Sequence, residues 1–165
     1  YSIVFTKGQV ALIKSDNRYW DIVDIQKSID ETFEVKCRPD ISSEDENFSD
    51  VEVTGTLRNI AGAVLADLTV TGNYKSLCDR CLEDVVLPLA AKIKTSVTED
   101  MQSKDDSLFI GNGKIDFGKT AYEALSLEIP TQILCKEDCK GLCHICGTNL
   151  NIKQCDCLKR EVFGE

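Results

Sequence analysis

Residues 134–158 read LCKEDCKGLCHICGTNLNIKQCDCL, a density of cysteines that suits a metal-binding module better than an ordinary apolar core. Within this stretch, Cys143 and Cys146 are separated by two residues and are followed by Gly147. A tight turn between two such cysteines aims both sulfurs at one ion, and glycine tolerates the left-handed backbone that the turn needs. Zinc takes four soft ligands in a tetrahedron, so this pair supplies half of a site.

Three further cysteine pairs can complete such a site: Cys135 with Cys139, Cys155 with Cys157, and the distant pair Cys78 with Cys81. All eight cysteines are therefore candidate zinc ligands, enough for two four-cysteine sites, although one site with spare thiols fits the spacing about as well. Free thiols and disulfides are the remaining alternatives. Metal is favoured because disulfides in small secreted domains are usually spread along the chain, whereas the first 77 residues here contain only Cys37.

Other residues of the cysteine-rich regions have structural interpretations. His144, the only histidine, lies between two expected ligands and is predicted to be an exposed spacer. Cys37 has no partner at a ligand spacing and is predicted to be a small core residue. Cys78 and Cys81 would point to opposite faces of a straight strand, so both can bind one ion only if a turn separates them. Alternatively, Arg80 is the residue presented there, and the cysteines only fix its loop.

The middle of the chain predicts antiparallel strands. Residues 51–57 alternate apolar with polar or small side chains, residues 59–62 provide a turn with Asn and Gly, and residues 63–74 resume the alternation. This pattern predicts a β-hairpin. A further extended run at 85–97 places residues 78–81 at a turn of the same meander.

The surrounding segments are assigned by composition and by helix signals. Short strands are predicted at 22–25 and 32–35, and the acidic stretches 42–50 and 98–107 are predicted to be solvated loops. Asp116 is the expected N-cap of a helix of about three turns that ends at Pro130, with its apolar face packed on the sheet.

Composition limits the classes of protein to which the chain can belong. It has 165 residues, 42% hydrophobic residues and a formal net charge of −9, which repels phosphate polymers at long range. No run approaches about 18 apolar residues, so no membrane span is predicted. Residues 1–14 lack the pattern of a signal peptide, which predicts a cytoplasmic protein.

Enzymatic activity is not expected. A single histidine excludes any plausible Ser-His-Asp array or HExxH metal site. An all-cysteine zinc site normally fills its coordination sphere, so its metal stabilises a fold and does not activate water. The sequence therefore predicts an α+β protein with two parts: an antiparallel β-rich body with one or a few helices at 1–130, and a small zinc-stabilised cysteine module at 131–165.

Three segments carry a resemblance to a known family: Cys78-Asp-Arg-Cys81-Leu after the predicted hairpin, the predicted helix ending in Leu127-Glu-Ile-Pro130, and residues 138–151, which read DCKGLCHICGTNLN. Over about residues 50–158, the chain resembles the YceD family of bacterial proteins linked to accumulation of large-subunit ribosomal RNA. The resemblance implies a cytoplasmic role in accumulation or maturation of that RNA, and no known catalytic reaction.

Three hypotheses of function are considered. The first is a ribosome-biogenesis factor that binds ribosomal RNA or a large-subunit assembly intermediate, with these candidate contacts: Arg80, Lys136, Lys140, Lys153, Lys159 and Arg160. The second is an acidic adaptor that binds a basic ribosomal protein without touching RNA. The third is a nuclease-type enzyme, for which no residue stands out. The sequence does not predict an oligomeric state.

Overall fold

A computed structural model of the chain describes residues 12–15, 18–21, 25, 27, 31–98, 108–111 and 114–157. The chain divides into two compact units, one made of 1–74 and 88–129 and the other of 75–87 and 130–165. The segment that carries Cys78 and Cys81 therefore belongs to the same unit as the C-terminal cysteines.

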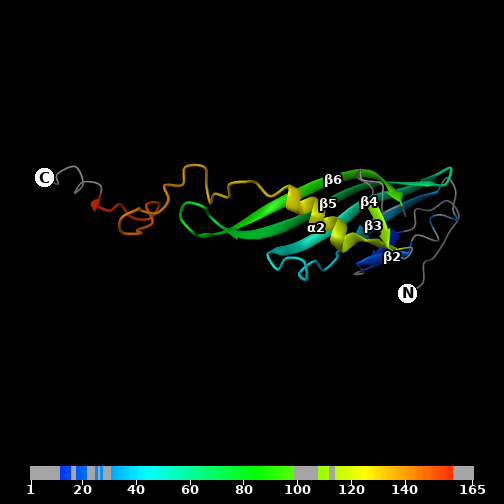
Figure 1. The fold of residues 1–165 in the computed structure, drawn as a ribbon, viewed down its shortest axis with the longest axis horizontal. Helices are drawn as coiled ribbons and strands as arrows, with labels where there is room; N and C mark the ends of the chain where they lie inside the picture. The colour runs from blue at the N-terminus through cyan, green and yellow to red at the C-terminus, as the bar shows by residue number, and fades with distance from the viewer. Residues whose placement is uncertain are drawn as a thin grey trace. The chain divides into compact units, whose positions relative to one another are not determined.

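The first unit is built on a β-sheet with the strand order β1-β3-β4-β5-β6-β7-β8-β2 (Figure 1). The strands of this sheet are β1 (Leu12–Ser15), β2 (Tyr19–Asp21), β3 (Thr32–Cys37), β4 (Phe48–Ile60), β5 (Ala63–Leu77), β6 (Asp84–Thr98), β7 (Leu108–Gly111) and β8 (Lys114–Asp116). Residues 75–77 of β5 and 84–87 of β6 belong to the second unit. β3 to β6 form the antiparallel centre, which confirms the predicted α+β class. Two pairs of strands are parallel, β1 with β3 and β7 with β6. The sequence did not predict these parallel pairs.

The predicted hairpin is formed by β4 and β5. Residues 53–60 pair with 63–70 in continuous register, and alternate side chains along both strands are buried. Ala61 and Gly62 connect the strands with φ values of 50° and 90°, the left-handed conformations of a two-residue hairpin turn. The buried Asn59 fixes this turn, because its Oδ1 accepts a hydrogen bond from Gly62 N at 3.0 Å.

The predicted helix is α2 (Phe117–Leu127), which lies beside the sheet in Figure 1. Asp116 is its N-cap, as expected, and accepts a hydrogen bond from Lys119 N at 2.9 Å. Its apolar face is buried at Phe117, Ala121 and Leu125 and packs on the sheet, as predicted. Together with Leu57 and Leu68 of the hairpin, these side chains form an apolar core.

Arg18 joins three segments that are far apart in the sequence. Its Nε donates to both carboxylate oxygens of Asp116, at 2.9 and 3.1 Å, and its Nη2 donates to Glu44. Burial opposes ionisation of Asp116, but the hydrogen bonds from Arg18 and Lys119 outweigh it and lower the pKa of this carboxyl. The helix N-cap is therefore held in its charged form.

Some predicted boundaries differ from the structure. The predicted strand at 22–25 is wrong at Ile25, which has helical backbone and is buried, and the other three residues lie outside the described part. The predicted loop at 42–50 is shorter, because Phe48 is buried and opens β4. Of the loop predicted at 98–107, Thr98 belongs to β6 and the remainder lies outside the described residues.

The strand at 32–35 and the core position of Cys37 are confirmed, with Cys37 buried at the end of β3. Burial raises the pKa of this thiol to about 11, so it stays protonated at neutral pH. Within the part of the chain that the structure describes, no helix is long and apolar enough to cross a membrane.

Replacing the N-cap by Asp116→Ala should destabilise the chain by about 1–2 kcal/mol at pH 7. Because the pKa of Asp116 is lowered on folding, its contribution is present above the ordinary carboxyl pKa and is lost as the pH falls through the folded value. Urea unfolding at pH 7, 5 and 3 should thus show the difference from wild type shrinking with acid. Glu123→Ala, at an exposed site on the same helix, should have little effect at any pH.

Candidate metal centres

The first pair of cysteines lies on a tight turn between β5 and β6. Cys78 N donates to Glu83 O at 2.8 Å, and Leu82 N donates back to Cys78 O at 2.9 Å. Leu82, directly after the second cysteine, has a φ of 58°. The turn predicted between Cys78 and Cys81 is thereby confirmed, and it brings both side chains to the same side of the chain.

The second CxxC repeats this hairpin. Cys143 N donates to Thr148 O at 2.8 Å, and Gly147 N donates to Cys143 O at 2.8 Å. Gly147 has a φ of 68° and occupies the position that Leu82 occupies in the first turn. The two segments therefore share one backbone design, in which the residue after the second cysteine has the left-handed conformation.

The eight predicted cysteines gather into two groups of four. We call Cys78, Cys81, Cys135 and Cys139 the first cluster, and Cys143, Cys146, Cys155 and Cys157 the second cluster; within each, the sulfurs lie within 4.8 Å of one another. Each CxxC turn thus supplies two sulfurs to one cluster, and the other two come from a different segment. Among the pairings that the spacing left open, the structure joins 78–81 with 135–139.

Sulfur spacing in the first cluster fits one tetrahedral ion. Cys78 Sγ lies 3.8 Å from Cys139 Sγ, and Cys81 Sγ lies 3.5 Å from Cys135 Sγ. Four sulfurs at about 2.3 Å from a central zinc would be about 3.8 Å apart, whereas a disulfide needs about 2.05 Å. All nine cysteines are free thiols. Each cluster can therefore hold a metal ion.

Residues between the cysteines tie the first cluster together. Asp79 N donates to Ile133 O at 2.8 Å, and Asp79 Oδ2 accepts from Ile133 N at 2.6 Å. Arg80 Nη1 donates to Cys139 O at 3.0 Å, and Arg80 O accepts from Leu142 N at 2.9 Å. These bonds align residues 133–142 with the turn, so Asp79 and Arg80 position the ligands of the opposite segment.

Burial distinguishes the two clusters. In the first, Cys78, Cys81 and Cys139 are buried, and Val85, Leu134 and Leu142 pack against them. In the second, Cys143 is buried, Cys155 and Cys157 are half-buried, and Cys146 is exposed. The predicted exposure of His144 is confirmed.

The thiols of each cluster differ in acidity. Burial and the neighbouring thiols raise the pKa of Cys135 to about 12, and the hydrogen bond with Cys146 together with burial raises that of Cys157 to about 12. Burial opposes ionisation of Cys78, but backbone N–H groups of Cys135, Arg80 and Cys81 outweigh it and lower its pKa to about 6. The hydroxyl of Thr148, 3.1 Å from Cys146 Sγ, acts with the backbone N–H of Thr148 and the thiols of Cys157 and Cys143 to lower the pKa of Cys146 to about 6. Four thiolates this close repel one another strongly, so all can ionise together only around a positive ion.

Two supporting residues were missed in the sequence. Thr148 contacts Cys146 as described, and Asn151 Nδ2 donates to Cys139 Sγ at 3.3 Å while its Oδ1 accepts from Lys140 N at 2.9 Å. Asn151 lies 12 residues from Cys139, and no spacing rule assigns an Asn to a sulfur at that distance. The signal available was only a cluster of Asn and Thr residues after the second CxxC.

A known protein family matches the part of the chain that contains both clusters. The sequence model of the family described as "Large ribosomal RNA subunit accumulation protein YceD" matches residues 66–163, more than half of the chain. The chain belongs to the YceD family. The match includes both clusters and most of β5 and β6.

The individual proteins that this chain is similar to are distant from it in sequence. An uncharacterized protein of Mycobacterium leprae is 30% identical over 103 residues, which cover 59% of this chain and 48% of that protein. The uncharacterized protein YlbN of Bacillus subtilis is 30% identical over 113 residues, covering 66% and 65% respectively. A chloroplastic protein of Arabidopsis thaliana, named as a YCED homolog for large ribosomal RNA subunit accumulation, is 42% identical over 48 residues, covering 29% and 15%.

The chain spans about half the length of the mycobacterial relative and much less of the plant one. No solved structure matches this chain.

The shared turn design predicts opposite effects of two substitutions. Gly147→Ala should weaken metal binding at the second cluster about fivefold, because alanine in a left-handed conformation costs about 1 kcal/mol. A Cβ at Gly147 meets no atom within 4 Å, so this cost comes from the backbone alone. Leu82→Gly should leave the first cluster as tight or tighten it by a similar factor. Competition with a chromophoric chelator measures both affinities, and a loss of affinity in Leu82→Gly would contradict the turn argument.

Proposed function

We propose that the chain is a non-catalytic cytoplasmic factor for accumulation or maturation of large-subunit ribosomal RNA, and that two zinc ions hold its C-terminal unit together. The family description supports the RNA role. The observation that carries the metal is the grouping of eight sulfurs into two sets of four. In this proposal, each cluster as defined above binds one ion.

Zinc suits both clusters by ligand type and number. Thiolate sulfur is a soft ligand, and four of them in a tetrahedron favour zinc or iron over magnesium or calcium. Zinc is favoured because it adopts the tetrahedral all-cysteine geometry in structural sites. Four protein ligands leave no open position for a water molecule, so the proposed ions stabilise the fold and carry out no reaction.

Elemental analysis should find two zinc ions per chain in protein purified without added metal. Cys81→Ser and Cys146→Ser should each lower the content to about one, because each removes a ligand from a different cluster. Cys37→Ser, which changes a buried thiol outside both clusters, should keep two. A chain without metal, or with iron in place of zinc, would overturn the proposal.

Loss of the protein should lower the ratio of large-subunit to small-subunit ribosomal RNA in the organism that encodes it. Wild type and Cys37→Ser should restore this ratio, whereas Cys81→Ser should restore it poorly because the first cluster is the buried one. The ratio can be measured by electrophoresis of total RNA. A normal ratio in the depleted cells would exclude the proposed role.

Charge favours a protein partner over naked RNA. The chain carries a net charge of −9, and each ion with four thiolates would contribute about −2. A basic partner, such as a large-subunit ribosomal protein or an assembly intermediate that displays one, would be attracted at long range. Under this second candidate function, the effect on ribosomal RNA is indirect.

A further inference from the structure

Within the described residues, one edge of β6 has no paired strand along much of its length. In the sheet, β5 lies on one side of β6, and on the other side β7 pairs only with Val97 and Thr98. Among the residues that the structure describes, no strand pairs with this outer edge along 88–96. Unpaired N–H and C=O groups of an edge strand are a template for another extended chain.

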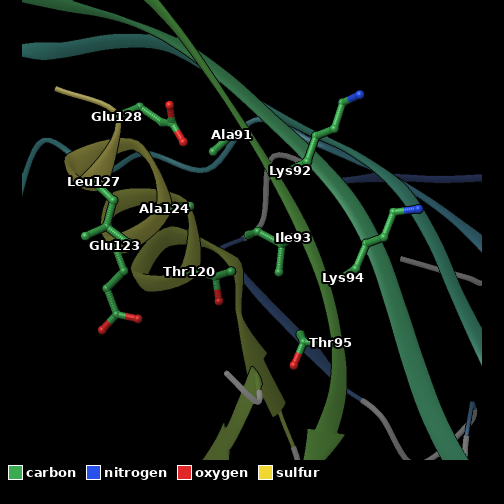
Figure 2. Close-up of a pocket in the computed structure, with 10 residues that line it drawn as sticks. All are labelled: Ala91, Lys92, Ile93, Lys94, Thr95, Thr120, Glu123, Ala124, Leu127 and Glu128. Carbon is green, nitrogen blue, oxygen red and sulfur yellow. The ribbon is translucent and has the colours of Figure 1, made fainter. Parts of the chain in front are cut away.

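A groove runs along this open edge. It has a volume of about 370 Å³ and lies between β6 and α2, as Figure 2 shows. On the strand side it is lined by the five consecutive residues 91–95. Since neighbouring side chains of a strand point to opposite faces, consecutive lining residues mean that β6 presents its backbone edge to the groove.

The side chains of the groove are apolar in its centre and acidic at its rim. Ile93 and Ala124 face each other across it. Leu127, in the last turn of α2, also lines it and is 87% exposed. Glu123 and Glu128 extend from the helix side, and Glu123 Oε1 lies 3.8 Å from Lys119 Nζ in an exposed pair that leaves the carboxylate accessible. An incoming strand can therefore bury apolar surface here and place positive charge against the helix.

The lysines of β6 point away from α2 (Figure 2). Lys94 Nζ is 3.0 Å from Asp67 Oδ2 of β5, and Lys92 is exposed. Antiparallel pairing of two copies of this edge around residue 93 would set Lys92 of one copy against Lys94 of the other. Like charges directly opposite each other destabilise a strand pair, so a second copy of this chain is a poor occupant.

We infer that the open edge of β6 binds an extended peptide segment of a basic protein as an additional strand. Every second side chain of this segment faces the groove. Along the segment, these groove-facing side chains alternate between apolar and basic. The apolar ones pack between Ile93 and Leu127, and the basic ones meet Glu123 and Glu128. Main-chain hydrogen bonds to 91–95 supply affinity, and the alternating side chains supply specificity.

This inference rests on the second candidate function, for which it supplies the surface and the chemistry of the partner. It requires no residue of either cysteine cluster. Metal content and ribosomal RNA levels can therefore agree with the proposed function whether or not this surface binds a strand.

The test uses the metal-loaded chain and a fluorescent nine-residue peptide. Threonine occupies every second position of this peptide, and valine and arginine alternate at the positions between the threonines. Leu127→Lys should weaken binding at least about tenfold, because it removes apolar contact and repels the arginines. Lysine is a good helix former and suits the C-terminal turn of α2, so the variant should fold normally. Leu65→Lys, at a half-exposed leucine of β5 that does not line the groove, is the matched control and should bind as wild type does.

Backbone methylation separates strand addition from other modes of binding. Two peptides are N-methylated at alternate residues, one at the threonines and the other at the valines and arginines. An added strand turns only one of these sets of N–H groups toward β6, so one peptide should lose binding and the other should keep it. Absence of binding, equal binding of both methylated peptides, or equal binding by Leu127→Lys and Leu65→Lys would each overturn the inference.

Discussion

Close grouping of cysteine sulfurs is the constraint on which the C-terminal unit depends. About 40 of its residues are described, a size at which a chain rarely buries enough apolar surface to fold unaided. Its buried cluster consists of Cys78, Cys81 and Cys139, with only a few apolar side chains around them. The buried interior of this unit therefore consists largely of cysteine sulfurs. Its stability depends on how the negative charge of the thiolates is compensated, by protons or by a bound cation.

The other unit is stabilised by the burial of apolar side chains. Its fully buried side chains include Phe117, Leu57, Leu68, Ile115 and Leu125, which come from both the sheet and the helix. Every described side-chain polar atom that is buried has a hydrogen-bond partner, as in the Asn59 turn. An apolar core of this kind needs no ion. Removal of the proposed metal ions and changes to the apolar core are therefore expected to act first on different units.

Local features were predictable from the sequence because they depend on neighbouring residues. Alternation along 51–57 and 63–74 indicated the hairpin, and Asp116 with the following apolar pattern indicated α2. The CxxC spacing indicated two metal-type turns for the same reason. Ile25 was misassigned because a short apolar run has no clear period, so a strand and a helix cannot be told apart there.

Contacts between residues far apart in the chain could not be predicted from the sequence. Cys81 meets Cys135 across 54 positions, and Arg18 meets Asp116 across 98. No spacing rule links such residues, and each pairing depends on the order of strands in the sheet or on the path of the chain around a turn. For this reason the candidate ligands were found as a set of eight, whereas their division into two fours needed the structure.

Charge limits the ways in which an acidic chain could carry out the proposed role in ribosomal RNA accumulation. Between positions 135 and 160 the sequence has five lysines and arginines and three acidic residues, and two ions with eight thiolates would add about four negative charges. Of the five basic residues, Lys159 and Arg160 lie outside the described part of the chain. This unit then has no excess of positive charge with which to bind a phosphate backbone. A strand edge flanked by glutamates instead matches an extended basic segment, and such segments bind RNA themselves. On this reasoning, the proposed role in ribosomal RNA accumulation would be exercised through a basic protein bound at this edge, and not through direct contact with the RNA.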